Sequence, residues 1–283
     1  KIGMNMLLWT THVTEADAPH LERIRAAGFD GVEIPIFEGN AEHYKKLRAV
    51  LDAQGLGCTT VTVSTEDANP ISADASVRQK AVDDLKLKIE LTAILGGEVL
   101  CGPYHQPLGV FSGDGPTEDE KKRAADVHRQ AAEFAESAGV KLGIEYLNRF
   151  ECYFLNTAHD AAQHVARVGH PAFRMMYDTF HANIEEKDPI GAFRDNAASI
   201  VHFHVSENDR GTPGTGHVPW LETFRAVRQS GYDGWMTIEA FGRALPDLAA
   251  ATRVWRDFFA RREDVYEQGI RFIREMWDKA ARA

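Results

Sequence analysis

The sequence predicts an α/β fold, a (β/α)8 barrel that forms one domain over residues 1–283 and has an additional helix at its C-terminal end. Short apolar segments alternate with longer segments of helical periodicity along the whole chain. Eight such pairs in about 280 residues match the usual size of this fold. A doubly wound open sheet is the competing architecture, but it normally has a glycine-rich turn after its first strand, and residues 8–12 contain no glycine.

The predicted strands are short and rich in Val, Ile and Met, which is typical of parallel strands that are buried on both faces. They cover residues 2–8, 31–35, 58–63, 98–101, 140–146, 173–177, 200–204 and 235–238.

The predicted helices lie between and after these strands. Glycine-containing segments such as 53–57 and 137–143 follow several of them, and glycine supplies the left-handed turn that ends a helix. Thr117, with Glu120 three residues later, is typical of a capped helix start. The helices cover residues 18–27, 41–54, 76–95, 118–138, 158–168, 189–198, 219–230, 246–259 and 264–279.

The composition argues against several classes of protein. The chain has a net charge of −10, whereas nucleic acids and anionic membranes bind proteins through basic faces. No apolar segment approaches the roughly 20 residues of a membrane span, and the first residues do not resemble a signal peptide. Cys58, Cys101 and Cys152 are too few for a disulfide framework. We expect a cytoplasmic protein with reduced thiols and no nucleic-acid or membrane partner.

Polar side chains gather at the C-terminal ends of the last four predicted strands, where the active site of such a barrel lies. They include Glu145, Asp178, His204 and Glu239. A carboxylate in an apolar strand is costly to bury unless it is paired or bound to a metal. Three neighbouring carboxylates would also raise one another's pKa, a conflict that a divalent cation removes.

These four residues are therefore predicted to bind one divalent metal ion, in preference to forming a purely structural network. Oxygen-rich ligation suits Mn²⁺, Mg²⁺ or Co²⁺. His202 shares a strand face with His204 but lies deeper, which favours a hydrogen-bonding role behind the ligands. The glycine-rich segment 211–216 lacks a lysine and does not open directly into a helix, so it is interpreted as a turn or lid, not as a phosphate site.

At these residues the sequence resembles the D-tagatose/D-psicose (allulose) 3-epimerase family, within the xylose-isomerase-like group of barrels. The matching segments are 145–157, 178–186, 204–220 and 232–241, in the right order and at the right strand ends. The similarity spans essentially the whole chain and is strongest from residue 140 to about residue 256. It implies inversion of carbon C3 of a free ketohexose or ketopentose, with Mn²⁺ as the expected cofactor.

The resemblance also implies residue roles. Glu145, Asp178, His204 and Glu239 correspond to the family's metal ligands, and Glu145 and Glu239 to its two acid/base carboxylates. Glu151, His181 and Arg210 correspond to residues that hold the substrate near its carbonyl. The N-terminal half departs more from the pattern, and there Trp9, Tyr104 and Phe111 are the expected pocket walls. For Arg210 the alternative is a surface ion pair with Glu207 or Asp209.

Two glutamates favour epimerisation because inversion removes a proton from one face of a carbon and returns one to the other. The alternative is an aldose–ketose or hydroxypyruvate isomerase on the same barrel, for which one base suffices. A barrel endonuclease would need more strand-end histidines and a basic surface, and a non-catalytic sugar sensor would not turn over a ketose. The expected partners are a small sugar and further copies of the chain, as a homodimer or homotetramer.

Overall fold

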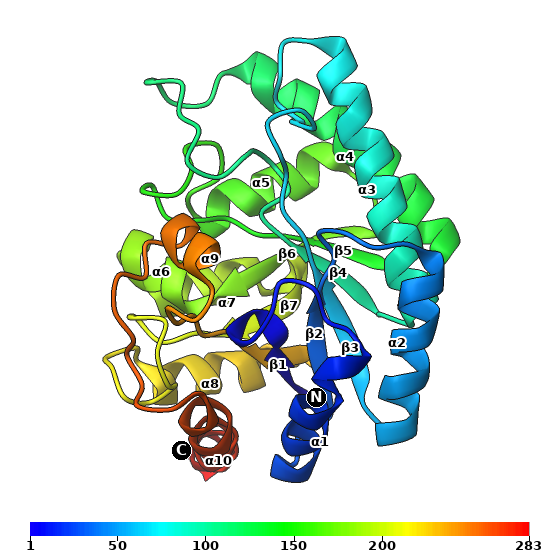
Figure 1. The fold of residues 1–283 in the computed structure, drawn as a ribbon. Helices are drawn as coiled ribbons and strands as arrows, with labels where there is room; N and C mark the ends of the chain where they lie inside the picture. Colours follow the sequence, from blue (N-terminus) through cyan, green and yellow to red (C-terminus); the bar gives the residue numbers. More distant parts are fainter. Residues whose placement is uncertain (283) are drawn as a thin grey trace.

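The computed structural model describes residues 1–282, and in it eight parallel strands close into a barrel in sequence order (Figure 1). The predicted (β/α)8 architecture is confirmed. The strands are β1 (Ile2–Asn5), β2 (Gly31–Pro35), β3 (Gly57–Val61), β4 (Val99–Gly102), β5 (Lys141–Ile144), β6 (Phe173–Asp178), β7 (Ile200–Val205) and β8 (Trp235–Ile238).

Helices surround the barrel, and the predicted C-terminal helix packs beside α8 and α1 (Figure 1). The helices are α1 (Ala18–Ala27), α2 (Ala41–Gln54), α3 (Ala75–Leu95), α4 (Glu118–Ala138), α5 (Ala158–Val168), α6 (Thr179–Glu185), α7 (Pro189–Asn196), α8 (Trp220–Gln229), α9 (Pro246–Ala251) and α10 (Arg262–Arg282). Short 3-10 helices cover Met6–Leu8, Glu15–Asp17 and Ala197–Ser199.

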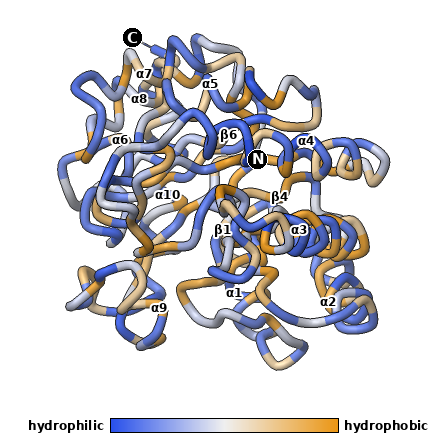
Figure 2. The backbone as a smooth tube through the Cα atoms, turned by 90° about the horizontal axis from the view of Figure 1, so that it is seen from above, coloured by the Kyte–Doolittle hydropathy of each residue, from blue (hydrophilic) through white to orange (hydrophobic). Residues whose placement is uncertain are grey.

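The helix ends follow the local sequence signals. Thr117 and Glu120 form the predicted reciprocal cap at the start of α4, and Gly139 ends that helix with φ 71°. Hydrophilic and hydrophobic residues alternate along the coils of α2, α3 and α4, as the view down onto the barrel shows (Figure 2). The buried residues of α2 are Tyr44, Leu47 and Leu51, which recur every three or four positions and so lie on one side of the helix.

The largest differences from the prediction are two elements that end early and one helix that was not predicted. The strand predicted over 2–8 ends at Asn5, because the Asn5 side chain accepts a hydrogen bond from Leu7 N and starts a 3-10 turn. The helix predicted over 246–259 ends at Ala251, where Arg253 adopts φ 61° and Val254 N donates to Ala249 O, which closes the helix. Helix α6 was not predicted.

A register shift between β6 and β7 aligns the polar side chains of the barrel interior. Met175 pairs with Ile200 but Met176 pairs with His202, so one residue of β7 is skipped. After the shift, Asp178 lies opposite His204. Both side chains therefore reach the same level at the C-terminal end of the barrel.

The glycine-rich segment 211–216 is a turn, as predicted, and a buried carboxylate fixes it. Glu207 accepts hydrogen bonds from Gly214 N (2.7 Å), Val218 N (3.2 Å) and the indole of Trp220 (2.9 Å). All three cysteines are free and buried.

Among the described residues, no helix combines the length and the apolar character that crossing a membrane requires.

Gly31→Ala is expected to destabilise the barrel by at least about 2 kcal/mol, because a methyl group there would overpack two strands. Its Cβ would overlap the carbonyl oxygen of Gly57 and lie 2.6 Å from the Trp235 ring. Urea unfolding would measure the loss. Gly115→Ala is the control, since a Cβ added at Gly115 would meet no atom within 4 Å, and equal stability of both variants would contradict the packing argument.

Candidate active site and metal centre

The structure brings Glu145, Asp178, His204 and Glu239 together at the C-terminal mouth of the barrel. One possible ligand atom from each lies within 4.8 Å of the others, and all four residues are buried. Glu145 directly follows β5 and Glu239 directly follows β8, while Asp178 and His204 lie in β6 and β7. The side chains converge because each lies at or just beyond the C-terminal end of a strand.

Asp178 offers one oxygen to this cluster. Its Oδ1 accepts a hydrogen bond from Phe180 N (2.6 Å) and caps α6. Its Oδ2 lies 2.8 Å from the Arg210 guanidinium and 3.6 Å from His204 Nδ1. The cap fixes the carboxylate plane, so Oδ2 points to the centre of the cluster.

His204 presents a nitrogen without a hydrogen-bond partner. Its Nε2 lies 2.8 Å from Glu33 Oε1, whereas no group among residues 1–282 accepts from or donates to its Nδ1. That atom lies 3.5 Å from Glu239 Oε1 and 3.6 Å from Asp178 Oδ2. A buried polar atom without a partner carries a free-energy cost that a cation would remove. The donor set of three carboxylates and one imidazole therefore fits a divalent metal ion.

Arg210 lies inside the cluster and does not form the alternative surface pair. Its Nη1 donates to Asp178 Oδ2 (2.8 Å), Glu239 Oε2 (2.6 Å) and Ser206 Oγ (2.8 Å). Its Nη2 lies 2.9 Å from His181 Nε2. The guanidinium thus connects the proposed ligands Asp178 and Glu239 with His181.

Two aromatic rings hold the Arg210 side chain in place. The guanidinium carbon lies 3.9 Å from the centre of the Phe180 ring and 4.9 Å from that of Phe241. Its backbone has φ 65°, a left-handed conformation that costs a residue other than glycine about 1 kcal/mol or more. Strained residues of this kind cluster at functional sites.

His181 and Glu151 lie beside the cluster and share one partner. The backbone N–H of Asn148 donates to His181 Nδ1 (3.0 Å), and the Asn148 amide donates to Glu151 Oε1 (2.7 Å). His181 Nε2 is 3.6 Å from Glu145 Oε1. Burial, followed by the charge of Arg210, lowers the pKa of His181 to about 3, so its imidazole is neutral.

Glu145 and Asp178 differ in their affinity for protons. Burial and the charge of Glu239 raise the pKa of Glu145 well above its usual range. Burial alone would also raise the pKa of Asp178, but Arg210 and His204 outweigh it and lower that pKa. Asp178 therefore stays ionised, whereas Glu145 is able to hold a proton.

A small cleft opens above these groups and is lined by Glu145, Glu151, His181, Arg210 and Glu239. Its apolar wall includes Leu7, Phe37, Val61, Leu108, Phe241 and Leu248.

The structure does not bring the three expected wall aromatics to this cleft. Trp9 packs against His20 and Tyr266, and Tyr104 is fully buried beside His128. Phe111 is 47% exposed and lies in a separate surface hollow with Tyr153. Those positions depend on how the loops pack, which strand periodicity does not report.

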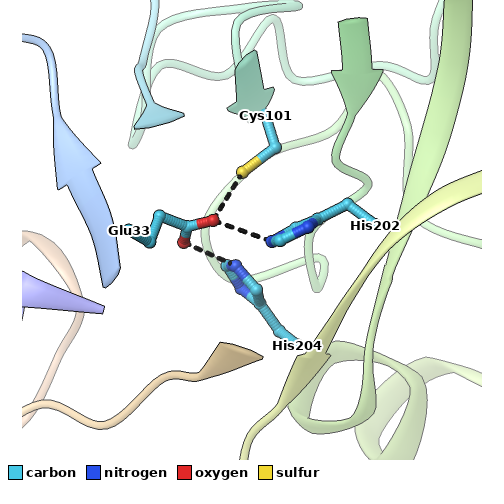
Figure 3. A group of neighbouring side chains, drawn as sticks. All are labelled: Glu33, Cys101, His202 and His204. Carbon is cyan, nitrogen blue, oxygen red and sulfur yellow. Dashed lines mark hydrogen bonds and ion pairs between the residues drawn. The ribbon is translucent and has the colours of Figure 1, made fainter. Parts of the chain in front are cut away.

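Sequence reasoning missed a buried carboxylate beneath the cluster. Glu33, on β2, is fully buried and contacts Cys101, His202 and His204 (Figure 3). His202 Nε2 lies 2.7 Å from Glu33 Oε2, so the predicted place of His202 behind the ligands agrees with the geometry. The signal was present in the sequence, since Glu33 is a charged residue in an apolar strand.

Comparison with known proteins identifies relatives that span the chain. The model of the xylose isomerase-like TIM barrel family matches residues 21–276. The chain is 33% identical to the D-psicose 3-epimerase of Ruminiclostridium cellulolyticum, covering 86% of this chain and 85% of the relative. It is 31% identical to the L-ribulose 3-epimerase of Mesorhizobium japonicum, covering 92% and 88%.

A solved structure of an L-ribulose 3-epimerase superimposes with a TM-score of 0.94 at 30% identity, covering 99% of this chain and 95% of that one. The chain therefore belongs to the xylose isomerase-like TIM barrel family and, within it, to the ketose 3-epimerases.

Proposed function

We propose that this ketose 3-epimerase depends on a divalent cation, with Mn²⁺ as the natural ion, and that Glu145 and Glu239 are its acid/base pair. The observation that carries the proposal is the convergence of Glu145, Asp178, His204 and Glu239 on one point of the mouth, with the Nδ1 atom of His204 unpartnered among residues 1–282. Three carboxylates and one imidazole are a typical donor set for Mn²⁺ or Mg²⁺.

The two glutamates would move the proton at C3. Glu145 and Glu239 come from β5 and β8, which are three strands apart around the barrel, so a sugar lying across the mouth would have one on each side. One carboxylate removes the C3 proton and the other returns a proton to the opposite face of the planar enediolate, with the roles exchanged in the reverse direction. When bound, the cation would act as a Lewis acid on the carbonyl and the neighbouring hydroxyl.

The remaining polar groups would orient the sugar. Arg210 and neutral His181 face the same cleft and can donate hydrogen bonds to the oxygens near the carbonyl, and Glu151 can accept one from a hydroxyl. Among the described residues that line the cleft, Arg210 is the one cationic side chain, and Asp178 and Glu239 already pair with it. This favours a free ketose over a phosphorylated one.

The candidate substrates are free ketohexoses and ketopentoses, namely D-tagatose, D-psicose with D-fructose, and L-ribulose. The names of the relatives support D-psicose and L-ribulose. The apolar residues of the cleft, which include Leu108 and Leu248, would contact the end of the sugar remote from its carbonyl.

The experiment that tests the proposal is incubation of purified protein and Mn²⁺ with each of these ketoses in D₂O. The C3 epimer is expected, with deuterium at C3 of the recovered sugar. The carboxylates exchange their protons with the solvent, so the carboxylate that returns a hydrogen to C3 delivers a deuteron. Exchange at another carbon, or an aldose product, would contradict C3 epimerisation.

Mn²⁺ binding is expected to tighten as the pH rises. Burial and Glu239 raise the pKa of Glu145, and the charges of Glu33 and Glu239 outweigh the effect of burial to raise the pKa of His204. Both groups must lose a proton to bind a cation, so falling pH favours the protonated forms that do not bind it. Titration calorimetry in buffers of different ionisation enthalpy would count the protons released, and a Kd independent of pH would contradict this prediction.

The assembly and location remain predictions. We expect a homodimer or homotetramer in the cytoplasm, and Trp255, which is 65% exposed on the segment after α9, is available for contact with a second copy. Light scattering of the purified protein would measure the oligomeric state.

A further inference from the structure

Glu33 is a fully buried carboxylate that belongs neither to the proposed ligands nor to the cleft. It lies on the inner face of β2, in register with Asn5 on β1 and Thr59 on β3. Figure 3 shows Cys101 and His202 directed at one of its oxygens and His204 at the other. A buried charge in this position needs an explanation.

Donors from four strands surround the Glu33 carboxylate. Oε1 accepts from Asn5 Nδ2 (2.9 Å) and lies 2.8 Å from His204 Nε2. Oε2 accepts from Thr59 Oγ1 (2.8 Å) and Cys101 Sγ (3.2 Å) and lies 2.7 Å from His202 Nε2. Each oxygen thus has at least two donors, which is what a buried ionised carboxylate requires.

These distances argue against a second cation between Glu33, Cys101, His202 and His204, although these side chains are close enough for a metal to be considered. Ligand atoms about 2.0 to 2.3 Å from one tetrahedral ion lie more than about 3 Å from each other. The two imidazole nitrogens are 2.7 and 2.8 Å from the Glu33 oxygens, which is hydrogen-bond length. Glu33 therefore forms hydrogen bonds with Cys101 and His204 and an ion pair with His202.

The network fixes the orientation of His204. An ionised carboxylate only accepts hydrogen bonds, so the hydrogen of a neutral His204 lies on Nε2, which faces Glu33. The lone pair is then on Nδ1, which faces Asp178 and Glu239. A histidine that binds a metal through one nitrogen usually donates its other N–H to a carboxylate in this way.

The same carboxylate also reaches Glu239. Asn5 Nδ2 donates one hydrogen to Glu33 Oε1 and one to Glu239 Oε1 (3.1 Å). The orientation of this amide is defined, because Asn5 Oδ1 accepts from Leu7 N (2.8 Å). Glu33 therefore contacts one proposed ligand, His204, directly and a second, Glu239, through Asn5.

We propose that Glu33 is a positioning residue of the metal centre, which directs Nδ1 of His204 and, through Asn5, the carboxylate of Glu239 toward one cation. The inference rests on the proposed metal dependence of the function.

Replacement of Glu33 by glutamine keeps its size but places an NH₂ group among donors. Whichever way the amide turns, it faces either His204 or His202 with a hydrogen. If it faces His204, Nε2 must accept, and the ring hydrogen moves to Nδ1, where the cation is expected. If it faces His202 instead, the oxygen that accepts from Asn5 and His204 belongs to a neutral amide, which is a weaker acceptor than a carboxylate, so the Nε2–H of His204 is held less firmly.

The test measures Mn²⁺ binding to the full chain by electron paramagnetic resonance, without substrate. Glu33→Gln is expected to raise the Kd for Mn²⁺ by about 10- to 100-fold. Thr60→Val is the matched control, because Thr60 is equally buried on β3 but bonds Thr92 and the Val99 carbonyl, not Glu33. Its Kd is expected to equal that of the wild type.

Electron spin-echo spectra of the bound Mn²⁺ separate positioning from a general loss of stability. The wild type is expected to show ¹⁴N coupling from one imidazole. This coupling is expected to be absent in His204→Ala and weakened in Glu33→Gln. A wild-type Kd in Glu33→Gln, or a raised Kd with unchanged coupling, would overturn the positioning role. A wild-type protein that binds no divalent cation would instead overturn the proposed metal dependence.

Asn5→Ala keeps the proposal testable if Glu33→Gln fails to fold. It removes the bridge between Glu33 and Glu239 without changing a charge. The Kd for Mn²⁺ is expected to rise by about tenfold, the lower end of the range for such partners. An unchanged Kd would show that the bridge does not act on the ligands.

Discussion

Glu145→Gln and Glu239→Gln are each expected to abolish epimerisation, with kcat falling by about 1000-fold or more. Both side chains are buried at the mouth of the barrel, and one carboxylate oxygen of each lies within 4.8 Å of the other. A glutamine keeps the shape of the side chain but neither takes up nor returns a proton. Because inversion needs one group on each face of C3, the remaining glutamate cannot complete the reaction alone.

The measurement is C3 epimer formation together with deuterium incorporation from D₂O, at saturating Mn²⁺ and with the bound metal quantified. The metal content is needed because both glutamates are also proposed ligands. Deuterium exchange at C3 without inversion, in a variant that keeps its cation, would identify the face served by the remaining carboxylate. Full activity in either variant would remove that residue from the mechanism.

Glu98→Gln is the control for the loss of a barrel glutamate. Glu98 immediately precedes β4, at the opposite end of the barrel, where it pairs with Lys1 and accepts a hydrogen bond from the Trp235 indole (3.1 Å). Its replacement removes a carboxylate without touching the mouth, so C3 exchange is expected to stay at the wild-type rate.

Much of the fold could be predicted because its signals are local. Helices α1, α2 and α5 begin and end at the predicted residues, since an N-terminal cap or proline and a C-terminal glycine mark each of them. Helix α6 was missed because it begins directly after a strand, and its cap, Asp178, was predicted only as a metal ligand. Asp178 serves both purposes, with one oxygen for each.

The residues of the candidate site could be predicted where their position at the end of a strand alone places them at the mouth of the barrel. Glu145, Asp178 and Glu239 are charged residues at the ends of apolar strands, and the closed barrel necessarily directs such residues toward one mouth. Glu33 is likewise a charged residue in an apolar strand, but it lies in the middle of β2. The expectation that site residues lie at the C-terminal ends of strands therefore did not select it.

The pocket walls could not be predicted, because they depend on loops whose packing is not local. Trp9 follows β1 as a wall residue would, yet the 3-10 turn at Met6–Leu8 directs it toward Tyr266, and Leu7 lines the cleft instead. Leu248 reaches the cleft from α9, nearly at the other end of the chain. No periodicity in the sequence records these contacts.

Removal of divalent cations is expected to abolish turnover and to lower the stability of the protein. Glu145, Asp178 and Glu239 are buried together, and Arg210 pairs directly with Asp178 and Glu239. Carboxylates at such distances repel one another strongly where water is excluded, and a bound cation offsets that repulsion. Because the cation binds only the folded chain, saturation at about 100 times Kd adds about 2.7 kcal/mol to the free energy of unfolding.

Dialysis against a chelator, followed by assay and thermal unfolding with and without added Mn²⁺, measures both effects. Mn²⁺ is expected to restore epimerisation and to raise Tm by several degrees, about 2 to 4 °C per kcal/mol for a chain of this size. His204→Ala supplies the comparison, because it removes the imidazole ligand and leaves the three carboxylates. Its Tm is expected to respond to Mn²⁺ much less than that of the wild type. A chelated wild-type protein that epimerises at full rate would contradict the metal dependence, since the two glutamates would then suffice to stabilise the enediolate.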